Sequence, residues 1–357
     1  EASLKAAGGS SELSVDGHFT KKPDVAIVVF GEEPYAEGNG DLDNLEYQRG
    51  HKKDLALLKK LKSQGIKVVS VFITGRPLWV NPELNASDAF LVAWLPGTEG
   101  GGVADLIFNK PNGDINFNFT GKLSFTWPAS PQQTAINRYD KDSVGLLPYG
   151  FGMSYGKSSS EENTLSNNLP EIVQSSNKTL PALALFDRAV KTPWALWMGG
   201  QNSRQEVTSS QQHNDTLALR TIDKVVQEDA LELIFTGQAQ VSISSAFPSD
   251  LRSYREANAS LVMNFKVDST ASNSVYIGMD CEDSCEARVD VGKQIQAAPL
   301  EQWQSLSIDL QCFQNAGANL GKIFTPFELI SAGNFGVSLA DIRIEPNTSH
   351  EANLNCQ

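Results

Sequence analysis

The stretch at residues 24–41, "DVAIVVFGEEPYAEGNGD", decides the fold of the first part of the chain. It begins with a continuous β-branched and aromatic run, which is typical of a parallel strand buried on both faces. The run then enters a loop that carries four carboxylates, those of Glu32, Glu33, Glu37 and Asp41. Because like charges this close together repel one another, the loop needs solvent, a partner or a chemical role.

The segments that follow alternate between helical and strand patterns as far as residue 128. The helical pattern "LEYQRGHKKDLALLKKLKSQG" ends at Gly65, and the apolar runs "IKVVSVFIT" and "AFLVAWL" come after it. The segment "GKLSFTWP" closes the series with alternating polarity, as an edge or hairpin strand. Strand–helix–strand order gives parallel strands with helices on both faces, so we expect a three-layer α/β sandwich domain at residues 1–157.

The style of the sequence changes after residue 157. Residues 158–180 are rich in Ser, Asn, Glu and Thr and contain few large apolar residues, so they are interpreted as a linker. Short alternating segments such as "QAQVSISS" and "SLVMNFKV" then follow, bounded by turn-forming residues. This pattern predicts an antiparallel β-sandwich of the jelly-roll kind at residues 181–357.

Composition excludes several classes of protein. The 357 residues are 40% hydrophobic and 20% charged, which is typical of a globular chain of about two domains. The net charge is −13 and Lys and Arg form no dense stripe, which argues against a nucleic-acid partner. No apolar stretch approaches the ~18 residues that a membrane span needs.

The four cysteines favour disulfides over a metal site. Cys281 and Cys285 lie in "CEDSC", whereas Cys312 and Cys356 lie far apart in the sequence. A metal site is not predicted, because a second close Cys or His pair is missing and the 4 His residues are scattered. We favour a disulfide Cys281–Cys285 and consider a second one, Cys312–Cys356, which together imply an oxidising compartment. Free, buried thiols are the alternative.

Three loops, at residues 31–44, 74–82 and 96–102, follow the strands at the edge of the sheet where open parallel sheets bind ligands. Glu37 is followed by glycines that allow the loop to hold it away from the domain, which suits a general acid/base. The alternative is a solvated acidic loop. Arg76 could clamp a ligand oxygen, but we favour a structural pair with a loop carboxylate. The glycine-rich "LPGTEGGGVAD" lacks the ending of a phosphate-binding loop.

Several of these motifs occur together in a familiar order. "KPDVAIVVFGEEPYAEGNGD", "TGRPLWV", "AWLPGTEGGGVADLIF", "GKLSFTWP" and "LPYGFGMSYG" resemble the second, α/β-sandwich domain of family-three glycoside hydrolases over residues 20–156. "VYIGMDCEDSC", "WQSLSIDLQCF" and "FGVSLADIRIEP" look like the β-sandwich extension of bacterial exo-1,3/1,4-β-glucosidases of the ExoP type. The opening "EASLKAAGG" is typical of the last turns of a helix that ends at its glycines, so we expect the C-terminal part of a longer protein.

The resemblance implies a retaining exo-β-glucosidase or β-glucanase that needs no cofactor. In that family the second domain supplies the acid/base Glu in a Tyr–x–Glu–x–x–Gly–Asp frame, which carries this role to Glu37, between Tyr35 and Asp41. An N-terminal (β/α)₈ barrel supplies the Asp nucleophile. Glu32 and Glu33 leave the same strand end as Glu37 and cannot face it across a sugar, as retaining hydrolysis requires. We therefore expect residues 1–357 alone to be inactive.

The expected partners are a β-glucan or gluco-oligosaccharide substrate and the barrel of the same enzyme, in a periplasmic or secreted protein. The rival hypothesis is a non-catalytic carbohydrate-binding protein with a degenerate hydrolase domain. The β-sandwich resembles a carbohydrate-binding module, although a spacer or brace is the alternative. In "WMGGQNSRQ", Gln201 could present its amide to sugar hydroxyls, whereas a plain polar hairpin is the other interpretation.

Overall fold

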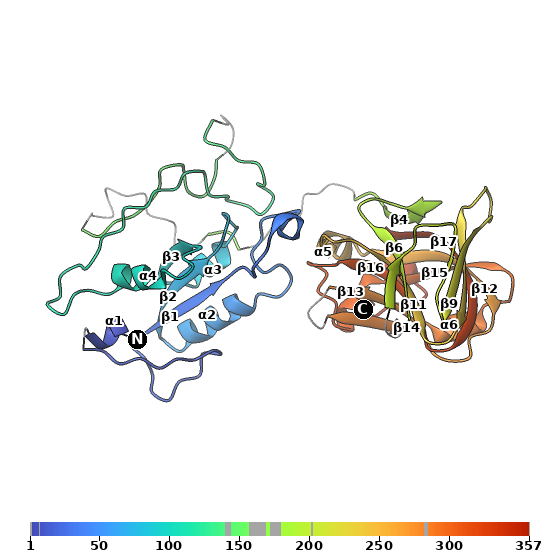
Figure 1. The fold of residues 1–357 in the computed structure, drawn as a ribbon, viewed down its shortest axis with the longest axis horizontal. Coiled ribbons are helices and arrows are strands. Elements are labelled where there is room, and N and C mark those ends of the chain that lie inside the picture. The colour runs from blue at the N-terminus through green and yellow to red at the C-terminus, as the bar shows by residue number, and fades with distance from the viewer. Residues whose placement is uncertain are drawn as a thin grey trace. The chain divides into compact units, whose positions relative to one another are not determined.

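The computed structural model of this chain divides into two compact units (Figure 1). The first unit comprises Glu1–Tyr35 and Asn44–Gln174, and the second comprises Ala36–Asp43 and Ser175–Gln357. The structure describes residues 2–6, 8–139, 144–156, 169–171, 180–200, 203–281 and 285–356. Across these ranges no helix is long and apolar enough to cross a membrane. The predicted domain boundaries at residues 157 and 181 stay predictions.

The first unit is built on a three-stranded parallel sheet in the order β1-β2-β3. Its strands are β1 (Val25–Gly31), β2 (Lys67–Ile73) and β3 (Ala89–Trp94). Its helices are α1 (Ala2–Ala6), α2 (Lys53–Ser63), α3 (Asn81–Asn85) and α4 (Gly100–Ile107). The expected fold class, a parallel α/β domain followed by antiparallel sheets, is confirmed.

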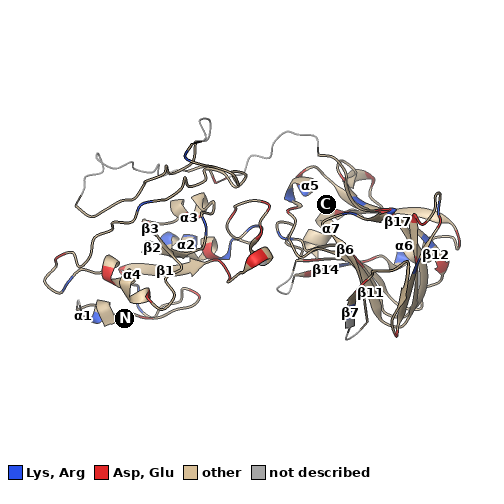
Figure 2. Cartoon of the chain, turned by 45° about the horizontal axis from the view of Figure 1, so that its top comes forward, with Lys and Arg blue, Asp and Glu red and all other residues tan. Residues whose placement is uncertain are grey.

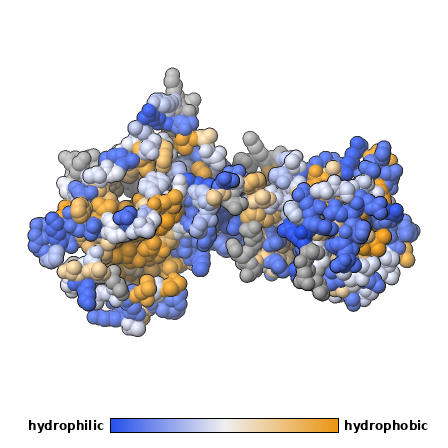
Figure 3. Space-filling model, viewed as in Figure 1, coloured by the Kyte–Doolittle hydropathy of each residue, from blue (hydrophilic) through white to orange (hydrophobic). Residues whose placement is uncertain are grey.

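One face of this sheet is well covered. Helix α2 packs against β1 and β2 and buries Leu55, Leu58 and Leu61, which recur at helical spacing. The other face leaves the β1 side chains of Ile27 and Val29 38% and 64% exposed. The apolar run of β1 is therefore buried on one face only. In the space-filling view, apolar surface gathers on this unit (Figure 3).

The segment "GKLSFTWP" at residues 121–128 does not form a regular strand. Trp127 makes an isolated antiparallel bridge with Leu147, and the Leu123 amide donates to the Phe151 carbonyl over 2.8 Å. Pro128 and Pro148 flank the bridge, and neither has an N–H with which to extend the ladder. The expected edge or hairpin strand is thus reduced to a short pairing.

The second unit contains two antiparallel sheets. The eight-stranded sheet has the order β15-β12-β17-β10-β9-β8, with β4 paired to β17 and β5, and the six-stranded sheet has the order β14-β13-β16-β11-β6-β7. The strands of the first are β4 (Leu183–Asp187), β5 (Ala189–Val190), β8 (Gln211–His213), β9 (Leu217–Ile222), β10 (Ala230–Thr236), β12 (Ser260–Ser269), β15 (Trp303–Asp309) and β17 (Asn334–Glu345). Those of the second are β6 (Ala195–Gly200), β7 (Ser203–Glu206), β11 (Ala239–Ser244), β13 (Val275–Asp280), β14 (Glu286–Asp290) and β16 (Thr325–Ser331).

The two sheets enclose one hydrophobic core. Every second residue of the inner strands contributes to it, including Phe235, Phe335 and Phe327, each no more than 2% exposed. The short helices of this unit are η1 (Glu37–Gly40), α5 (Arg252–Glu256), α6 (Gly292–Ala297), α7 (Leu310–Asn315) and η2 (Ser349–Glu351). The β-sandwich predicted from the alternating pattern is confirmed.

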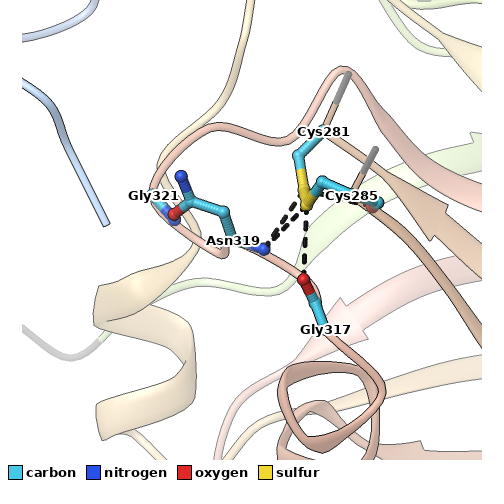
Figure 4. The surroundings of a disulfide bond; sticks show 5 residues. All are labelled: Cys281, Cys285, Gly317, Asn319 and Gly321. Carbon is cyan, nitrogen blue, oxygen red and sulfur yellow. Dashed lines mark hydrogen bonds between the residues drawn. A yellow bond between two sulfur atoms is a disulfide. The ribbon is translucent and has the colours of Figure 1, made fainter. Parts of the chain in front are cut away.

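The favoured disulfide Cys281–Cys285 and the second one that we considered, Cys312–Cys356, are both present. Cys281 and Cys285 close the connection between β13 and β14, with their Cα atoms 5.3 Å apart. The backbone N–H of Asn319 lies 3.1 Å from both sulfur atoms (Figure 4). Cys312 and Cys356 are joined as well, with Cα atoms 5.0 Å apart. The oxidising compartment that they imply stays a prediction.

Most of the predicted linker at residues 158–180 lies outside the described residues. Asn85 binds the described segment at residues 169–171. The Asn85 side chain donates to the Leu169 carbonyl over 2.9 Å and accepts from the Leu169 N–H over 3.0 Å. It also donates to the Glu171 carboxylate over 3.0 Å.

Candidate active site

Glu32 and Arg76 form an ion pair at the carboxyl ends of β1 and β2. The Arg76 Nε atom donates to Glu32 Oε1 over 2.9 Å, and the Arg76 and Glu32 side chains are 22% and 12% exposed. The second oxygen of Glu32 accepts from the Thr74 hydroxyl over 2.6 Å and from the Gly75 amide over 3.3 Å. Glu32 therefore has donors on both carboxylate oxygens.

Tyr35 adds an aromatic layer to this pair. The Arg76 guanidinium lies 4.1 Å from the centre of the Tyr35 ring, a cation–π contact. The Tyr35 hydroxyl lies 3.5 Å from Glu32 Oε2. Burial raises the pKa of Tyr35, and the nearby Glu32 carboxylate raises it further, so the phenol stays protonated at neutral pH.

This network fixes the entry to the acidic loop. The structural pairing that we favoured for Arg76 is confirmed, and its partner is Glu32. The sequence did not show that Thr74, Gly75 and Tyr35 complete the cluster. A signal for it was present, because Thr74–Gly75–Arg76 follow β2 at the same sheet edge where Glu32 follows β1.

A hollow of about 460 Å³ lies beside Arg76. It is lined by Leu45, Arg76, Pro77, Phe125, Thr126, Pro128, Gln133, Thr134, Ala135, Ile136 and Asn137. Its wall thus combines apolar side chains with amides and one guanidinium.

Glu37 differs from Glu32 in its exposure and in its lack of hydrogen-bond partners among the described residues. It opens helix η1 with φ of 47°, in the left-handed region that residues with a Cβ avoid. Its side chain is exposed, and within the described residues its carboxylate has no hydrogen-bond partner. The glycines at 38 and 40 follow it inside the same short helix. Glu37 is thus a free carboxylate on a strained backbone.

The residues around η1 belong to the second compact unit. The backbone N–H of Asp250 donates to Asp43 Oδ2 over 3.3 Å, and a Cβ added to Gly38 would lie 3.4 Å from the Phe247 ring. A Cβ at this distance would make ordinary van der Waals contact with the ring. These contacts give the Glu37 segment a defined support.

A buried charge cluster in the first unit was not foreseen. Lys52 Nζ lies 3.2 Å from Glu46 Oε1 and 3.7 Å from Glu83 Oε1, and the Glu83 side chain is fully buried. Burial raises the pKa of Glu83, whereas the Lys52 ammonium opposes that rise. The only sequence signal was an acidic residue in "WVNPEL", where Pro82 lies in the first turn of helix α3.

Gln201, the other predicted site residue, lies outside the described residues. Among the described residues, no group of three or more His, Cys, Asp or Glu side chains could hold a metal ion. In the view of Figure 2, Lys and Arg are scattered and form no continuous stripe over the part of the chain that is described.

Comparison with known proteins matches two parts of this chain to family models. Residues 3–156 match the family model of the glycosyl hydrolase family 3 C-terminal domain. This part of the chain is a family 3 C-terminal domain. Residues 192–344 match the Exop_C model, which is described as galactose-binding domain-like. The resemblance inferred from the sequence motifs is confirmed for both parts of the chain.

Two curated relatives match part of the chain. The lysosomal beta glucosidase of Dictyostelium discoideum is 32% identical over 181 residues, covering 48% of this chain and 21% of the relative. The periplasmic beta-glucosidase of Salmonella typhimurium strain LT2 is 31% identical over 164 residues, covering 41% of this chain and 21% of the relative. The matches thus cover about a fifth of the length of these relatives.

A solved structure is similar to both parts together. The exo-1,3/1,4-beta-glucanase ExoP from a Pseudoalteromonas species is 33% identical to this chain. The match covers 97% of this chain and 42% of that one, with a TM-score of 0.47.

Proposed function

We propose that this chain is part of a retaining, exo-acting β-glucosidase or β-glucanase. The enzyme would release glucose from the non-reducing ends of β-glucans or gluco-oligosaccharides. The observation that carries the proposal is the family 3 match of residues 3–156, which contain the Glu37 loop. Both curated relatives are named as β-glucosidases.

In the proposed mechanism Glu37 is the general acid/base. Its carboxylic acid protonates the glycosidic oxygen as the aglycone leaves, and its carboxylate then removes a proton from the water that attacks the glycosyl-enzyme. The left-handed backbone at Glu37 supports this role, because strain of this kind concentrates at functional positions. The chemistry needs no cofactor.

The nucleophile would come from an aspartate on an N-terminal (β/α)₈ barrel of the same enzyme. Retaining hydrolysis requires two carboxyl groups about 5–5.5 Å apart, on opposite sides of the sugar. Glu32 does not suit the task, because Thr74, Gly75 and Arg76 already occupy its oxygens. We propose a periplasmic or secreted location, which the two disulfides support.

Turnover of an aryl β-glucoside tests the assignment of Glu37. Residues 1–357 alone should be inactive, and joining them to the barrel should restore activity. In that active protein, Glu37→Ala should lower kcat/KM on substrates with poor leaving groups by about 10²–10⁴-fold. Added azide should partly rescue turnover of substrates with activated leaving groups, because it attacks the glycosyl-enzyme without needing a base.

Glu33→Ala is the matched control, because it removes the same charge from an exposed position of the same loop. It should leave kcat/KM close to the wild-type value. Full activity without Glu37 would refute its catalytic role. An inactive full-length protein would instead favour the rival, a non-catalytic carbohydrate-binding protein.

Gln201 is proposed as a substrate-binding residue that presents its amide to sugar hydroxyls. Gln201→Ala should then raise KM more than it lowers kcat, because it removes binding that substrate and transition state share. An unchanged KM would return this segment to the interpretation of a plain polar hairpin.

A further inference from the structure

The outward face of the six-stranded sheet carries a buried carboxylate that no described protein group satisfies. Glu328 lies on β16, between Gly278 on β13 and Ser242 on β11. The residue is only 9% exposed, and within the described residues its carboxylate has neither a hydrogen bond nor an ion pair. The Glu328 oxygens are not among the fully buried side-chain atoms that lack a partner, so they reach the surface of this face, where a ligand can donate to them.

The register of the strands places aromatic and polar side chains on the same face. The cross-strand row that contains Glu328 runs from Arg288 through Gly278, Glu328 and Ser242 to Trp197. Tyr276 follows on the same face of β13, opposite Ile330. We call this set the Glu328 face. Trp197, Tyr276 and Glu328 lie outside the hydrophobic core between the sheets.

The Glu328 face has a buried centre and accessible sides. Glu328, Ser242 and Ile330 are at most 9% exposed, whereas Trp197 and Tyr276 are partly exposed. Strands are about 4.8 Å apart, so Trp197 stands two strands, or about 10 Å, from Glu328. The Glu328 carboxylate lies over Gly278, where an added Cβ would come within 3.0 Å of Glu328 Oε2.

The charges on this face select the kind of ligand. Arg288 is on the strand beyond Gly278, and Arg204 lies over the Trp197 ring at 4.7 Å and donates to the Ser244 hydroxyl over 2.7 Å. These two guanidinium groups disfavour a cation at Glu328. Asp280 and Glu286 add negative charge and disfavour an anion. A neutral ligand that donates hydrogen bonds and has apolar ring faces fits both conditions.

We propose that the Glu328 face binds the β-glucan or gluco-oligosaccharide chain, with a sugar hydroxyl donating to Glu328 and sugar rings contacting Trp197 and Tyr276. A carboxylate only accepts hydrogen bonds, so hydroxyl groups match it. Aromatic side chains supply the apolar surface that the C–H faces of a sugar can cover. The ligand class rests on the proposed function, whereas the site rests on the geometry of this face.

The test measures binding of a soluble mixed-linkage β-glucan by residues 1–357, using calorimetry or affinity electrophoresis. Glu328→Gln and Trp197→Ala should each weaken binding at least tenfold. Glu256→Gln, which removes an exposed charge from helix α5 of the same unit, should leave affinity unchanged. If Glu328→Gln does not fold, the Trp197→Ala result decides.

The pH dependence of affinity separates a ligand contact from a structural role. An ionised carboxylate accepts hydrogen bonds more strongly than its acid. Wild-type affinity should therefore rise between about pH 5.5 and 8, and the affinity of Glu328→Gln should not. The charged groups facing Glu328 are Arg288 and Glu286 on β14, Asp280 on β13 and Arg204 on β7. None of them is a histidine, the side chain whose charge ordinarily changes over this range.

Turnover of a small aryl β-glucoside by the barrel-containing protein distinguishes failure of this site from failure of the proposed function. Glu328→Gln should leave that turnover at the wild-type value even though it weakens glucan binding. The site is overturned if the wild-type chain binds no glucan, or if Glu328→Gln and Trp197→Ala both bind as tightly as the wild type. Neither result bears on whether Glu37 is the acid/base.

Discussion

Arg76 holds Glu32 across the carboxyl ends of two neighbouring parallel strands, with Nε 2.9 Å from Oε1. The pair separates the carboxylates of the acidic loop into two kinds. Glu32 is enclosed by donors at the root of the loop, whereas Glu37 stands exposed farther along it. The loop thus combines one enclosed carboxylate with exposed ones, including that of Glu37.

Arg76→Ala should destabilise the first unit. It would leave the mostly buried Glu32 carboxylate without its charged partner, at a cost of about 1–3 kcal/mol in the free energy of unfolding. Urea denaturation measures the change. Lys53→Ala removes an exposed positive charge from helix α2 and should alter stability by less than about 0.5 kcal/mol. Equal effects of the two substitutions would contradict a specific Arg76–Glu32 contribution.

Glu328 should make the β-sandwich less stable as pH rises. Burial raises the pKa of Glu328 from its ordinary value of 4.5 to about 7, so the folded state holds a proton that the unfolded chain releases. The destabilisation is absent below pH 4.5, grows between pH 4.5 and 7, and is complete above pH 7, at about 3 kcal/mol.

Comparing Glu328→Gln with the wild type isolates this contribution. The variant should gain stability relative to the wild type as the pH is raised from about 5 to 8, in urea titrations at each pH. A stability difference that does not change with pH would mean that Glu328 keeps an ordinary pKa in the folded protein.

The left-handed backbone of Glu37 predicts that two substitutions there differ in stability although both abolish activity. Glu37→Gly should be more stable than Glu37→Ala by about 1 kcal/mol, because glycine adopts φ of 47° without the Cβ penalty. Both variants should lack acid/base catalysis. Chemical denaturation checks the stability difference, and aryl-glucoside assays check the loss of catalysis. A more stable alanine variant would argue against strain at this position.

The two disulfides should contribute unequally. Cys312–Cys356 closes a loop with a sequence separation of 44, whereas Cys281–Cys285 spans a separation of 4. Loop-closure entropy assigns about 4 kcal/mol to the first and about 2 kcal/mol to the second. Paired Cys→Ser substitutions, compared by guanidinium denaturation, should show this order. The reverse order would mean that chain entropy does not govern their effect.

The sequence predicted the elements whose pattern is local. Continuous apolar runs located β1, β2 and β3, and alternation located the strands of the β-sandwich. The regular strand expected for "GKLSFTWP" was wrong. Its alternating polarity does not show that Pro128, and Pro148 on the facing segment, prevent the pairing from extending. Burial of both faces of β1 was also an overestimate, since an apolar run does not show whether other elements cover both faces of its sheet.

Buried charges were the least predictable features. Alternation in "FELIS" assigns Glu328 to the outward face and therefore to solvent, yet the residue is only 9% exposed, between Ser242 and Gly278 of the neighbouring strands. Glu83 is likewise fully buried beside Lys52, which comes from a distant segment and also pairs with Glu46. Periodicity shows which way a side chain points, but not what long-range packing later places over it.

The outer edge of β1 should affect how this protein behaves at high concentration. β1 ends the three-stranded sheet, and no further strand is paired to it among the described residues. Backbone groups along such a rim recruit strands from neighbouring molecules. Concentrated samples should self-associate there, and Val29→Lys, which puts a charge on the exposed side of that strand, should keep the protein monomeric in light scattering.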